Sequence, residues 1–217
     1  MRVGIFGGSF DPPHTGHLLV ALDARDALAL DLVVVVPAAN QPLKGYGQTP
    51  AAHRLAMVER CFGGLDGFVV DPIEIERGGL SFMVDTVTEF RVRWPLATLH
   101  LLVGADVVAT LPRWRDPERL LSLAQLVVLR RGADGGWSTT TDTQQSTLDV
   151  DLPVAAATDA APRLETRVVE VSSTEVRTRV QEGRTIRGFV PEAVEAYIAS
   201  AGLYVRVPIP TDVAARA

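Results

Sequence analysis

The sequence predicts an α/β protein built on a doubly wound parallel sheet, with a small helical portion at its C-terminal end. Short apolar runs alternate with longer amphipathic stretches along most of the chain, and this alternation is typical of βαβ units. One run, Leu32–Pro37 (LVVVVP), is apolar at successive positions, as expected of a parallel strand that is covered on both faces. Because such sheets bind ligands beyond the carboxyl ends of their strands, we expect the functional residues at that edge.

The order of elements in the first half follows the hydrophobic pattern. We expect a strand over 2–6, a helix over 17–30, a strand over 32–37, a helix over 51–62, one or two short strands over 67–75 and a helix over 82–93. Leu55, Val58 and Phe62 recur at helical spacing within the second helix. Pro72 interrupts the segment of short strands, and Pro95 closes the third helix.

The second half continues the alternation around one irregular segment. We expect a strand over 98–103, a helix over 116–123, strands over 126–129 and 166–171, and helices over 174–181 and 191–200. Gly183 and Gly202 lie where helices commonly end. Residues 132–161 are polar and lack periodicity, so we expect a flexible surface insert there, with a weak hairpin near 147–152.

Length and composition limit the possible classes of protein. The 217 residues suffice for one sizeable domain, which we expect over 1–204, followed by a loose C-terminal tail over 205–217. The formal net charge of −5 disfavours a broad basic face for nucleic acid. The longest apolar run, at 32–39, is far too short to span a bilayer, and no secretory signal precedes the first strand. The single cysteine, Cys61, fits a reducing compartment, so we expect a cytoplasmic protein without nucleic-acid or membrane partners.

A glycine-rich turn with two histidines, GSFDPPHTGH over residues 8–17, follows the first predicted strand. The start of the next helix offers free backbone N–H groups and the positive end of the helix dipole. If the helix begins near His14, then His14 and His17 lie on one face of its first turn, and Gly16 between them permits close approach. Imidazoles donate hydrogen bonds to phosphate oxygens. The pattern therefore favours a nucleotide site over a simple capped helix start with one buried structural histidine.

Other motif classes fit this segment less well. Two histidines can begin a zinc site, but three protein ligands are usual, and no His-Glu-x-x-His is present. The remaining histidines, His53 and His100, lie in a predicted helix and a predicted strand, so we expect no metal site formed by the chain. The sequence lacks a P-loop, and its first turn lacks a clean Gly-x-Gly-x-x-Gly, which disfavours a dinucleotide-binding Rossmann enzyme.

A second polar motif, VSSTEVR over residues 171–177, follows a predicted strand and opens a helix. Ser172 and Glu175 have the spacing of a capping box, so helix capping alone is one interpretation. Arg177, one turn into the helix, adds a guanidinium beside free N–H groups and hydroxyls. This combination suits a diphosphate or triphosphate.

The two motifs resemble the paired signatures of the HxGH nucleotidylyltransferases. Residues 8–17 are similar to the first signature and residues 171–177 to the second, Ile-Ser-Ser-Thr-x-Ile-Arg, at about the separation that the family has. The similarity continues through 191–198 and 202–204, and it is greatest with the bacterial nicotinate-nucleotide adenylyltransferases. The resemblance implies a Rossmann-like nucleotidylyltransferase fold. It also implies adenylyl transfer from ATP to nicotinate mononucleotide in NAD biosynthesis, with nicotinate adenine dinucleotide and pyrophosphate as products.

The resemblance implies an ATP site built from both motifs. Lys44 matches a family position that reaches the phosphates, although Leu43 replaces the histidine that usually precedes it. Asp106 can accept hydrogen bonds from ribose hydroxyls and Gly104 permits close approach, although an aspartate there also suits a helix N-cap. The implied catalytic residues are His14, His17 and Arg177, and the implied ATP-binding residues are Gly7, Gly8, Ser9, Phe10, His14, His17, Lys44, Gly104, Asp106, Ser172, Ser173, Thr174 and Arg177.

The resemblance also implies a site for the pyridine nucleotide. Residues 81–86 (SFMVDT) are similar to the family segment Ser-Tyr-Thr-x-Asp-Thr, with Phe82 and Met83 in place of Tyr and Thr. Backbone N–H groups at this helix start can still hold the nicotinate carboxylate. Trp114 matches a family tryptophan that stacks on the pyridine ring, although packing under a lid is an alternative role. The implied pyridine-side residues are Asn40, Met83, Asp85, Thr86 and Trp114.

The implied chemistry needs no general base, because the attacking phosphate oxygen is already anionic near neutral pH. Catalysis then consists of in-line positioning and charge stabilisation, with His17 at the α-phosphate and Mg²⁺ arriving on ATP.

Either Arg130 or Arg131 is expected to border the adenine. Nicotinamide mononucleotide or phosphopantetheine remains open as the acceptor, as does a nucleotide-binding module without turnover. A homo-oligomer is also left open.

Overall fold

The computed structural model describes residues 1–42, 49–131, 154–167 and 169–206. Within these residues, six parallel strands form one sheet in the order β3-β2-β1-β4-β5-β6. The strands are β1 (Arg2–Gly8), β2 (Leu32–Pro37), β3 (Phe68–Val70), β4 (Thr98–Gly104), β5 (Gln125–Arg131) and β6 (Arg163–Thr166). The strand order reverses between β1 and β4, so the predicted doubly wound α/β sheet is confirmed.

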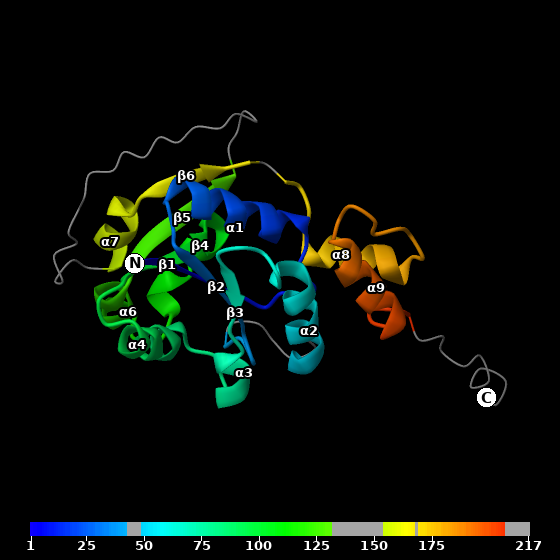
Figure 1. The fold of residues 1–217 in the computed structure, drawn as a ribbon, viewed down its shortest axis with the longest axis horizontal. Coiled ribbons are helices and arrows are strands. Elements are labelled where there is room, and N and C mark those ends of the chain that lie inside the picture. The colour runs from blue at the N-terminus through cyan, green and yellow to red at the C-terminus, as the bar shows by residue number, and fades with distance from the viewer. Residues whose placement is uncertain (43–48, 132–153, 168, 207–217) are drawn as a thin grey trace, which may run out of the picture.

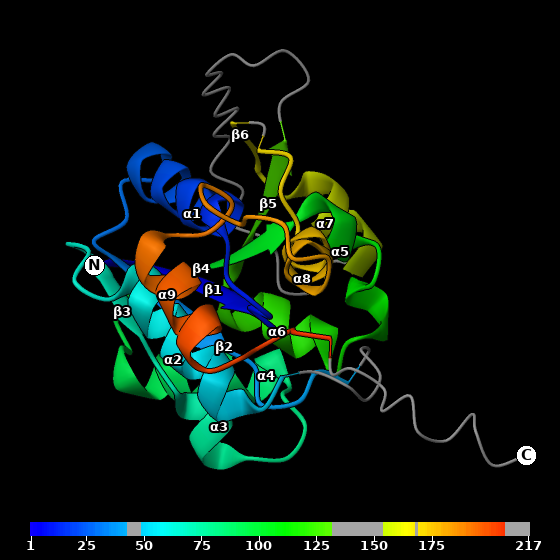
Figure 2. The ribbon, with the colours of Figure 1, turned by 90° about the vertical axis from the view of Figure 1, so that its right-hand side faces the viewer.

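Helices cover both faces of the sheet (Figures 1 and 2). The core on one face includes residues of α1 (Thr15–Ala27), α2 (Ala51–Phe62), α8 (Ser173–Gln181) and α9 (Glu192–Ser200). The core on the other face includes residues of α3 (Ile73–Arg77), α4 (Met83–Arg93) and α6 (Pro117–Leu123). Shorter elements are α5 (Ala105–Val108), a 3₁₀ turn (Leu111–Arg113) and α7 (Val154–Ala160). In Figure 1, α8 and α9 lie together at the right-hand end of the molecule as the predicted C-terminal helical portion.

The central strands divide their side chains between the two cores. In β2, Val33 and Val35 belong to the core with α1 and α2, while Val34 and Val36 belong to the opposite core. All four valines are almost fully buried. Because both faces of the strand are covered, the run is apolar at every position, and its predicted bounds are confirmed.

Of the one or two short strands predicted over 67–75, one is present, and the residues after Pro72 are helical instead. β3 ends at Val70, and the chain turns into α3 from Ile73. The Asp71 carboxylate accepts a hydrogen bond from the Ile73 N–H at 3.0 Å, and Pro72 contributes a φ of −78°. An aspartate and a proline together therefore start a helical turn where the apolar residues alone suggested a strand.

The strand predicted over 166–171 is wrong in position, because β6 spans Arg163–Thr166. Arg167 turns away from the sheet toward Asp23 on α1. The Asp23 carboxylate accepts the Arg167 backbone N–H at 3.2 Å and pairs with its guanidinium at 2.6 Å. A carboxylate 144 positions earlier therefore takes the backbone donor that a longer strand would use.

The insert predicted over 132–161 is helical in its last part. α7 forms from Val154 and buries Ala157, so the surface loop does not extend to 161 as expected. The hairpin expected near 147–152 and most of the expected tail lie outside the described residues. Among the described helices, none is long and apolar enough to cross a membrane.

Candidate active site

The first motif lies at the carboxyl edge of the sheet, beside the point where the strand order reverses. β1 pairs with β2 as far as Gly8 but with β4 only as far as Ile5, so β1 and β4 part before β1 ends. The loop 9–13 then leads into α1. Open parallel sheets bind ligands at such a switch point.

His14 and His17 form a reciprocal cap at the start of α1, which begins two residues earlier than predicted. The His14 Nδ1 accepts from the His17 N–H at 3.3 Å, and the His17 Nδ1 accepts from the His14 N–H at 3.2 Å. Their rings stack with centroids 3.7 Å apart. Because each Nδ1 accepts a backbone proton, each neutral ring carries its own proton on Nε2, and Nε2 is the atom through which it can donate. Capping and phosphate binding are therefore compatible here.

Small residues let the histidine pair pack closely. A Cβ on Gly16 would lie 3.0 Å from the His14 Nδ1, so the close approach expected at this glycine is made by the histidine ring. A Cβ on Gly8 would lie 3.0 Å from the ring of Phe10, which is buried and has a φ of 49°. The Phe10 ring meets the His17 ring edge-on at 5.1 Å and so supports it from the core.

The second motif docks on the loop that carries the first. The Ser173 hydroxyl donates to the Pro12 carbonyl at 2.8 Å, and the Arg177 guanidinium donates to the Asp11 carbonyl at 2.6 Å. Arg177 also donates to the Thr174 hydroxyl at 3.2 Å. These contacts join residues 161 and 166 positions apart, so the structure brings the two motifs together.

The capping prediction at α8 is half correct. Ser172 is the N-cap, and its hydroxyl accepts from the Glu175 N–H at 3.1 Å. The Glu175 carboxylate lies instead 3.9 Å from the Arg179 guanidinium, one turn further along the helix. The start of α8 is thus capped by a side chain of the motif itself.

Asp11 links the first motif to two further segments. Its carboxylate accepts from the Tyr204 hydroxyl at 2.7 Å and from the Thr49 N–H at 3.1 Å. Burial raises the pKa of the Tyr204 hydroxyl, which therefore keeps its proton and remains a donor at neutral pH. The segment 202–204 thus anchors the C-terminal part of the chain to the loop that precedes His14.

Arg54 on α2 supports this region, and the sequence interpretation missed it. The side chain is 1% exposed. Burial lowers the pKa of its guanidinium, and the charge of Asp11 opposes that shift. The guanidinium donates to four backbone carbonyls at 2.6–2.9 Å, those of Ser9, Ala38, Ala39 and Thr49. Arg54 therefore ties the loop after β1 to the loop after β2.

Several residues expected at the pyridine nucleotide meet at the start of α4. The Ser81 N–H donates to the Asn40 carbonyl at 2.9 Å, and the Ala39 N–H donates to the Ser81 hydroxyl at 2.8 Å. A Cβ on Gly7 would lie 2.4 Å from the Met83 Cε, so the glycine makes room for this side chain. The end of β1, the loop after β2 and the first turn of α4 are therefore in contact.

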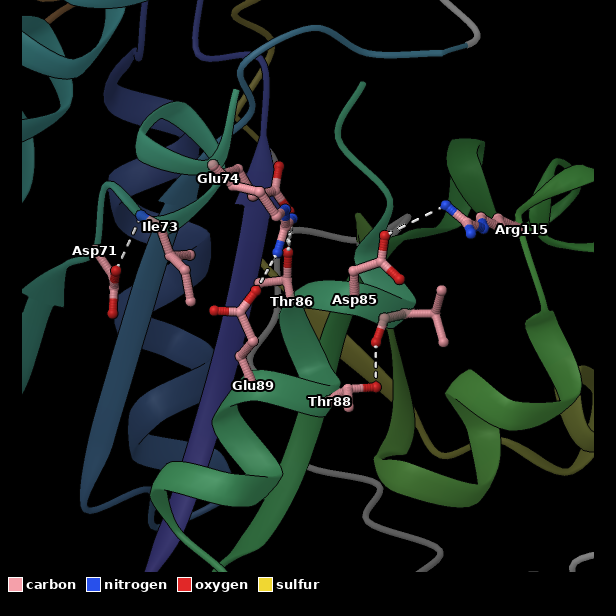
Figure 3. A network of polar contacts seen from close by, with 10 residues as sticks. Asp71, Ile73, Glu74, Asp85, Thr86, Thr88, Glu89 and Arg115 are labelled. Atoms are coloured by element: carbon pink, nitrogen blue, oxygen red, sulfur yellow. Dashed lines mark hydrogen bonds and ion pairs between the residues drawn. The ribbon is translucent and has the colours of Figure 1, made fainter. Parts of the chain in front are cut away.

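A polar network surrounds the first turns of α4 (Figure 3). The Thr86 hydroxyl donates to the Glu74 carboxylate at 2.6 Å and accepts from the Arg77 guanidinium at 2.8 Å. Burial raises the pKa of Glu74, and the hydrogen bond from Thr86 opposes that rise. Thr86 has no exposed surface, so its side chain is placed behind the site and does not line it.

Asp85 and Trp114 complete the predicted pyridine side. The Asp85 carboxylate lies 3.5 Å from the Arg115 guanidinium (Figure 3), which also lies 4.7 Å from the centroid of the Phe82 ring. The Trp114 Nε1 donates to the Thr110 hydroxyl at 3.0 Å, and the indole is partly buried. The segment after the 3₁₀ turn is therefore in contact with the start of α4.

The remaining predicted residues are less closely grouped. Gly104 is the N-cap of α5 and Asp106 is exposed within that helix, so the capping alternative for Asp106 is wrong. Arg130 is exposed near the end of β5. Lys44 and the side chain of Arg131 lie outside the described residues.

The other two histidines, on α2 and β4, are not part of either motif. The His53 Nδ1 is 2.9 Å from the Tyr197 hydroxyl, between α2 and α9. His100 is buried in β4, where burial and the charge of Arg2 lower its pKa to about 4. Within the described part of the chain, no three His, Cys, Asp or Glu side chains gather as a group that could hold a metal ion.

The chain matches the family model described as cytidylyltransferase-like over residues 5–179. It is 60% identical over 208 residues to a probable nicotinate-nucleotide adenylyltransferase of Gemmatimonas aurantiaca, with 96% of this chain and 94% of that protein covered. A protein of the same name from a Roseiflexus species is 40% identical over 210 residues, with 93% and 97% covered.

Solved structures share the fold at low sequence identity. A Plasmodium falciparum nicotinic acid mononucleotide adenylyltransferase complexed with NaAD matches with a TM-score of 0.67 and 16% identity, over 94% of this chain and 97% of that one. A putative nicotinate-nucleotide adenylyltransferase from Vibrio parahaemolyticus matches with a TM-score of 0.64 and 17% identity, over 95% and 98%. These matches show a shared fold.

Proposed function

The chain belongs to the nicotinate-nucleotide adenylyltransferase family, and we propose that its reaction takes place at the carboxyl edge of the sheet, between the two motifs. The reaction transfers the adenylyl group of ATP to nicotinate mononucleotide, giving nicotinate adenine dinucleotide and pyrophosphate in NAD biosynthesis. The observation that carries the location is the docking of Ser173 and Arg177 on the loop that leads into His14.

The chemistry favours positioning over proton transfer. The phosphate oxygen of the acceptor attacks the α-phosphorus of ATP, and the bond from that phosphorus to the pyrophosphate oxygen breaks. Because the attacking oxygen is already anionic near neutral pH, the site has to align the two nucleotides and stabilise charge. We assign the α-phosphate to His17 and a neighbouring phosphate oxygen to His14, each donating through Nε2. The reciprocal cap, which occupies both Nδ1 atoms, supports this assignment.

The departing pyrophosphate is assigned to the second motif. Arg177, the hydroxyls of 172–174 and the start of α8 place donors and positive charge next to the first motif. We assign Lys44 to the same phosphates. Mg²⁺ enters as part of the ATP substrate and bridges its phosphates. Asp106, exposed beyond β4, is assigned to the ribose of ATP.

The acceptor nucleotide is assigned to the other side of β1. Asn40, Met83 and Asp85 gather at the start of α4, and Trp114 follows the 3₁₀ turn beside them. A partly buried indole offers a flat surface on which a pyridine ring can stack. These contacts favour a pyridine nucleotide over phosphopantetheine, which has no aromatic ring at that end.

A substrate panel tests the proposal. Purified protein is incubated with Mg²⁺-ATP and, separately, nicotinate mononucleotide, nicotinamide mononucleotide or phosphopantetheine, and pyrophosphate release and the dinucleotide product are measured. We expect the highest kcat/KM with nicotinate mononucleotide. Turnover with phosphopantetheine alone would refute the acceptor assignment, and ATP binding without pyrophosphate release would indicate a binding module.

We further propose a cytoplasmic location, with which the single, buried Cys61 thiol is compatible.

A further inference from the structure

A buried polar network joins α3 to α4 outside the two phosphate-binding motifs (Figure 3). Thr86 has no exposed surface, and Glu74 is 2% exposed. Thr86 bonds both to the Glu74 carboxylate, at 2.6 Å, and to the Arg77 guanidinium, at 2.8 Å. Arg77 donates in addition to the Glu89 carboxylate at 2.6 Å. One hydroxyl therefore connects a carboxylate and a guanidinium of α3 to the second turn of α4.

A carboxylate is costly at such a buried position. Removing an ionised carboxylate from water is unfavourable unless the group is paired and hydrogen-bonded. Burial raises the pKa of Glu74, while hydrogen bonds from Thr86 and Ser81 and the charge of Arg77 act in the opposite direction. Apolar side chains of similar volume would fill this space without that cost. The network is therefore better explained by the geometry that it imposes than by stability.

The network brackets the connection between α3 and α4, residues 78–82. Gly78 and Gly79 both have left-handed φ angles, of 69° and 68°. Glycine restricts the backbone least of all residues, so this connection is weakly determined by its own sequence. Glu74 and Arg77 precede it and Thr86 follows it, so the network ties its two ends together.

The same connection holds the loop after β2. Leu80 forms an isolated bridge with Asn40, and the Asn40 side chain donates to the Gly79 carbonyl at 3.0 Å. Ser81 adds hydrogen bonds to the backbone of Asn40 and of the residue before it. The position of Asn40 relative to Met83 therefore depends on the conformation of 78–82.

We propose that Glu74, Arg77 and Thr86 are positioning residues that hold the acceptor side of the site and so set the affinity for nicotinate mononucleotide. The proposal rests on the proposed function, because it takes the start of α4 as the acceptor site. ATP phosphates are assigned to motifs on β1, α1 and α8, which the network does not contact through any of its hydrogen bonds among the described residues. Loss of the network therefore weakens binding of the acceptor and spares binding of ATP.

Thr86→Val tests the proposal, with Thr88→Val as its matched control. Both substitutions remove a threonine hydroxyl from α4, but the Thr88 hydroxyl donates to the Val84 carbonyl of the same helix at 2.7 Å and, within the described part of the chain, links no other element. A displacement of about 1 Å in a positioning element can cost up to about 10²-fold, so we expect Thr86→Val to raise the KM for nicotinate mononucleotide by about tenfold. The KM for ATP should stay within about twofold of wild type in both variants, and Thr86→Ser should restore the acceptor KM.

Steady-state kinetics with each substrate varied, together with thermal unfolding, separate the outcomes. An equal rise in both KM values, or a lower Tm and kcat with both KM values unchanged, would give Thr86 a merely structural role and overturn the proposal.

If Thr86→Val does not fold, Glu74→Gln replaces it, since it keeps an oxygen for the Thr86 hydroxyl and removes the charge that faces Arg77. The same selective rise is expected, and its absence overturns the proposal. A wild-type chain that forms no nicotinate adenine dinucleotide overturns the proposed function as well, whereas wild-type turnover with unselective variants overturns the positioning role alone.

Discussion

In the proposed site, the histidine pair combines helix capping and phosphate binding in the same two side chains. Serine or aspartate at position 14 would cap α1 equally well through a side-chain oxygen. Neither would project a second donor beyond the cap, whereas an imidazole accepts at Nδ1 and donates at Nε2. The reciprocal cap orients both rings through the backbone of their own helix. Two donors are thus held in place before any phosphate arrives, which is what charge stabilisation in a transition state requires.

His17→Ala is expected to lower kcat by about 10²–10⁴-fold, the usual effect of losing one preorganised donor. The measurement is pyrophosphate release at saturating ATP and acceptor. The variant also loses one half of the cap, so its thermal unfolding is recorded to correct for the folded fraction. His53→Ala is the matched control, because His53 lies outside the two motifs in the sequence and its Nδ1 is 2.9 Å from the Tyr197 hydroxyl. Wild-type turnover in His17→Ala would remove His17 from the catalytic assignment.

Arg115 is the residue at which the preference for nicotinate over nicotinamide mononucleotide can be tested. Its guanidinium lies over the Phe82 ring and near Asp85, at the first turn of α4. A cation there favours the anionic nicotinate over the neutral nicotinamide, but the pair is exposed, so the effect is modest. We expect Arg115→Ala to lower the ratio of kcat/KM for the two mononucleotides by about 3–10-fold, equivalent to about 1 kcal/mol. Arg113→Ala, which removes another exposed cation of the same segment, should leave the ratio unchanged. Equal ratios in the two variants would contradict the role of Arg115.

At the scale of elements, α2 has the predicted bounds, and two of the three apolar residues that predicted its buried face, Val58 and Phe62, are in the core. The helix buries Arg54, Met57, Val58, Cys61 and Phe62, whereas Leu55, expected in the core, is only partly buried. A signal was present in the sequence, because Arg54 stands one turn before Val58 on the apolar side of an amphipathic helix. A charged residue at a core position indicates a buried polar partner. The partners are backbone carbonyls of the loop after β1 and of the connection between β2 and α2, which no residue pattern identifies.

Arg54→Lys tests the contribution of this buried guanidinium to stability. A lysine keeps the charge but cannot match the planar fork that reaches four carbonyls. Each buried acceptor left without a partner costs about 1–3 kcal/mol, and partial compensation makes a net loss of about 2–4 kcal/mol the expected result. Urea unfolding measures it. Arg60→Lys, on the exposed face of the same helix, should change stability by less than about 0.5 kcal/mol, as surface substitutions usually do. A loss in Arg54→Lys no larger than in this control would contradict the assigned role.

The end of β6 is misplaced because it depends on a distant side chain. α2 has its predicted bounds because Pro50 and Gly63 flank a periodic apolar pattern, and β2 has its predicted bounds because its apolar run ends at Pro37. β6 ends early because Asp23 on α1 binds the backbone of Arg167. A local pattern cannot identify such a partner, since the distance between the two residues exists only in the folded chain.

At the scale of the whole molecule, a few long-range polar contacts assemble the site from separate segments. Arg177 of α8 and Tyr204 beyond α9 both bind Asp11, one through its carbonyl and one through its carboxylate. Asp23 and Arg167 join α1 to the segment after β6. The C-terminal helical portion is therefore part of the site, which extends over both ends of the described chain.

His100 should make global stability depend on pH. Its pKa is lowered from 6.5 to about 4 in the folded chain, so between these values the unfolded chain binds more protons. The contribution of neutral His100 to the free energy of unfolding is therefore fully present above pH 6.5. It is lost as the pH falls toward 4, by at most about 3 kcal/mol. Urea unfolding of wild type and His100→Leu between pH 7.5 and about 4.5 measures the difference, and the variant should show the flatter profile. Parallel profiles would contradict this prediction.

The sequence by itself determined the fold class, most element positions and the two motifs to which phosphate binding is assigned, because periodicity and turn residues act over a few positions. It also indicated that His14 and His17 lie on one face of the first turn of α1, whereas the reciprocal cap between them was found only in the structure. Only the tertiary structure decided that the second motif docks on the first, that Arg54 joins the loops, and that Thr86 lies behind the site. These contacts join residues that are distant along the chain, and they exist only after the sheet has brought its strand ends to one edge.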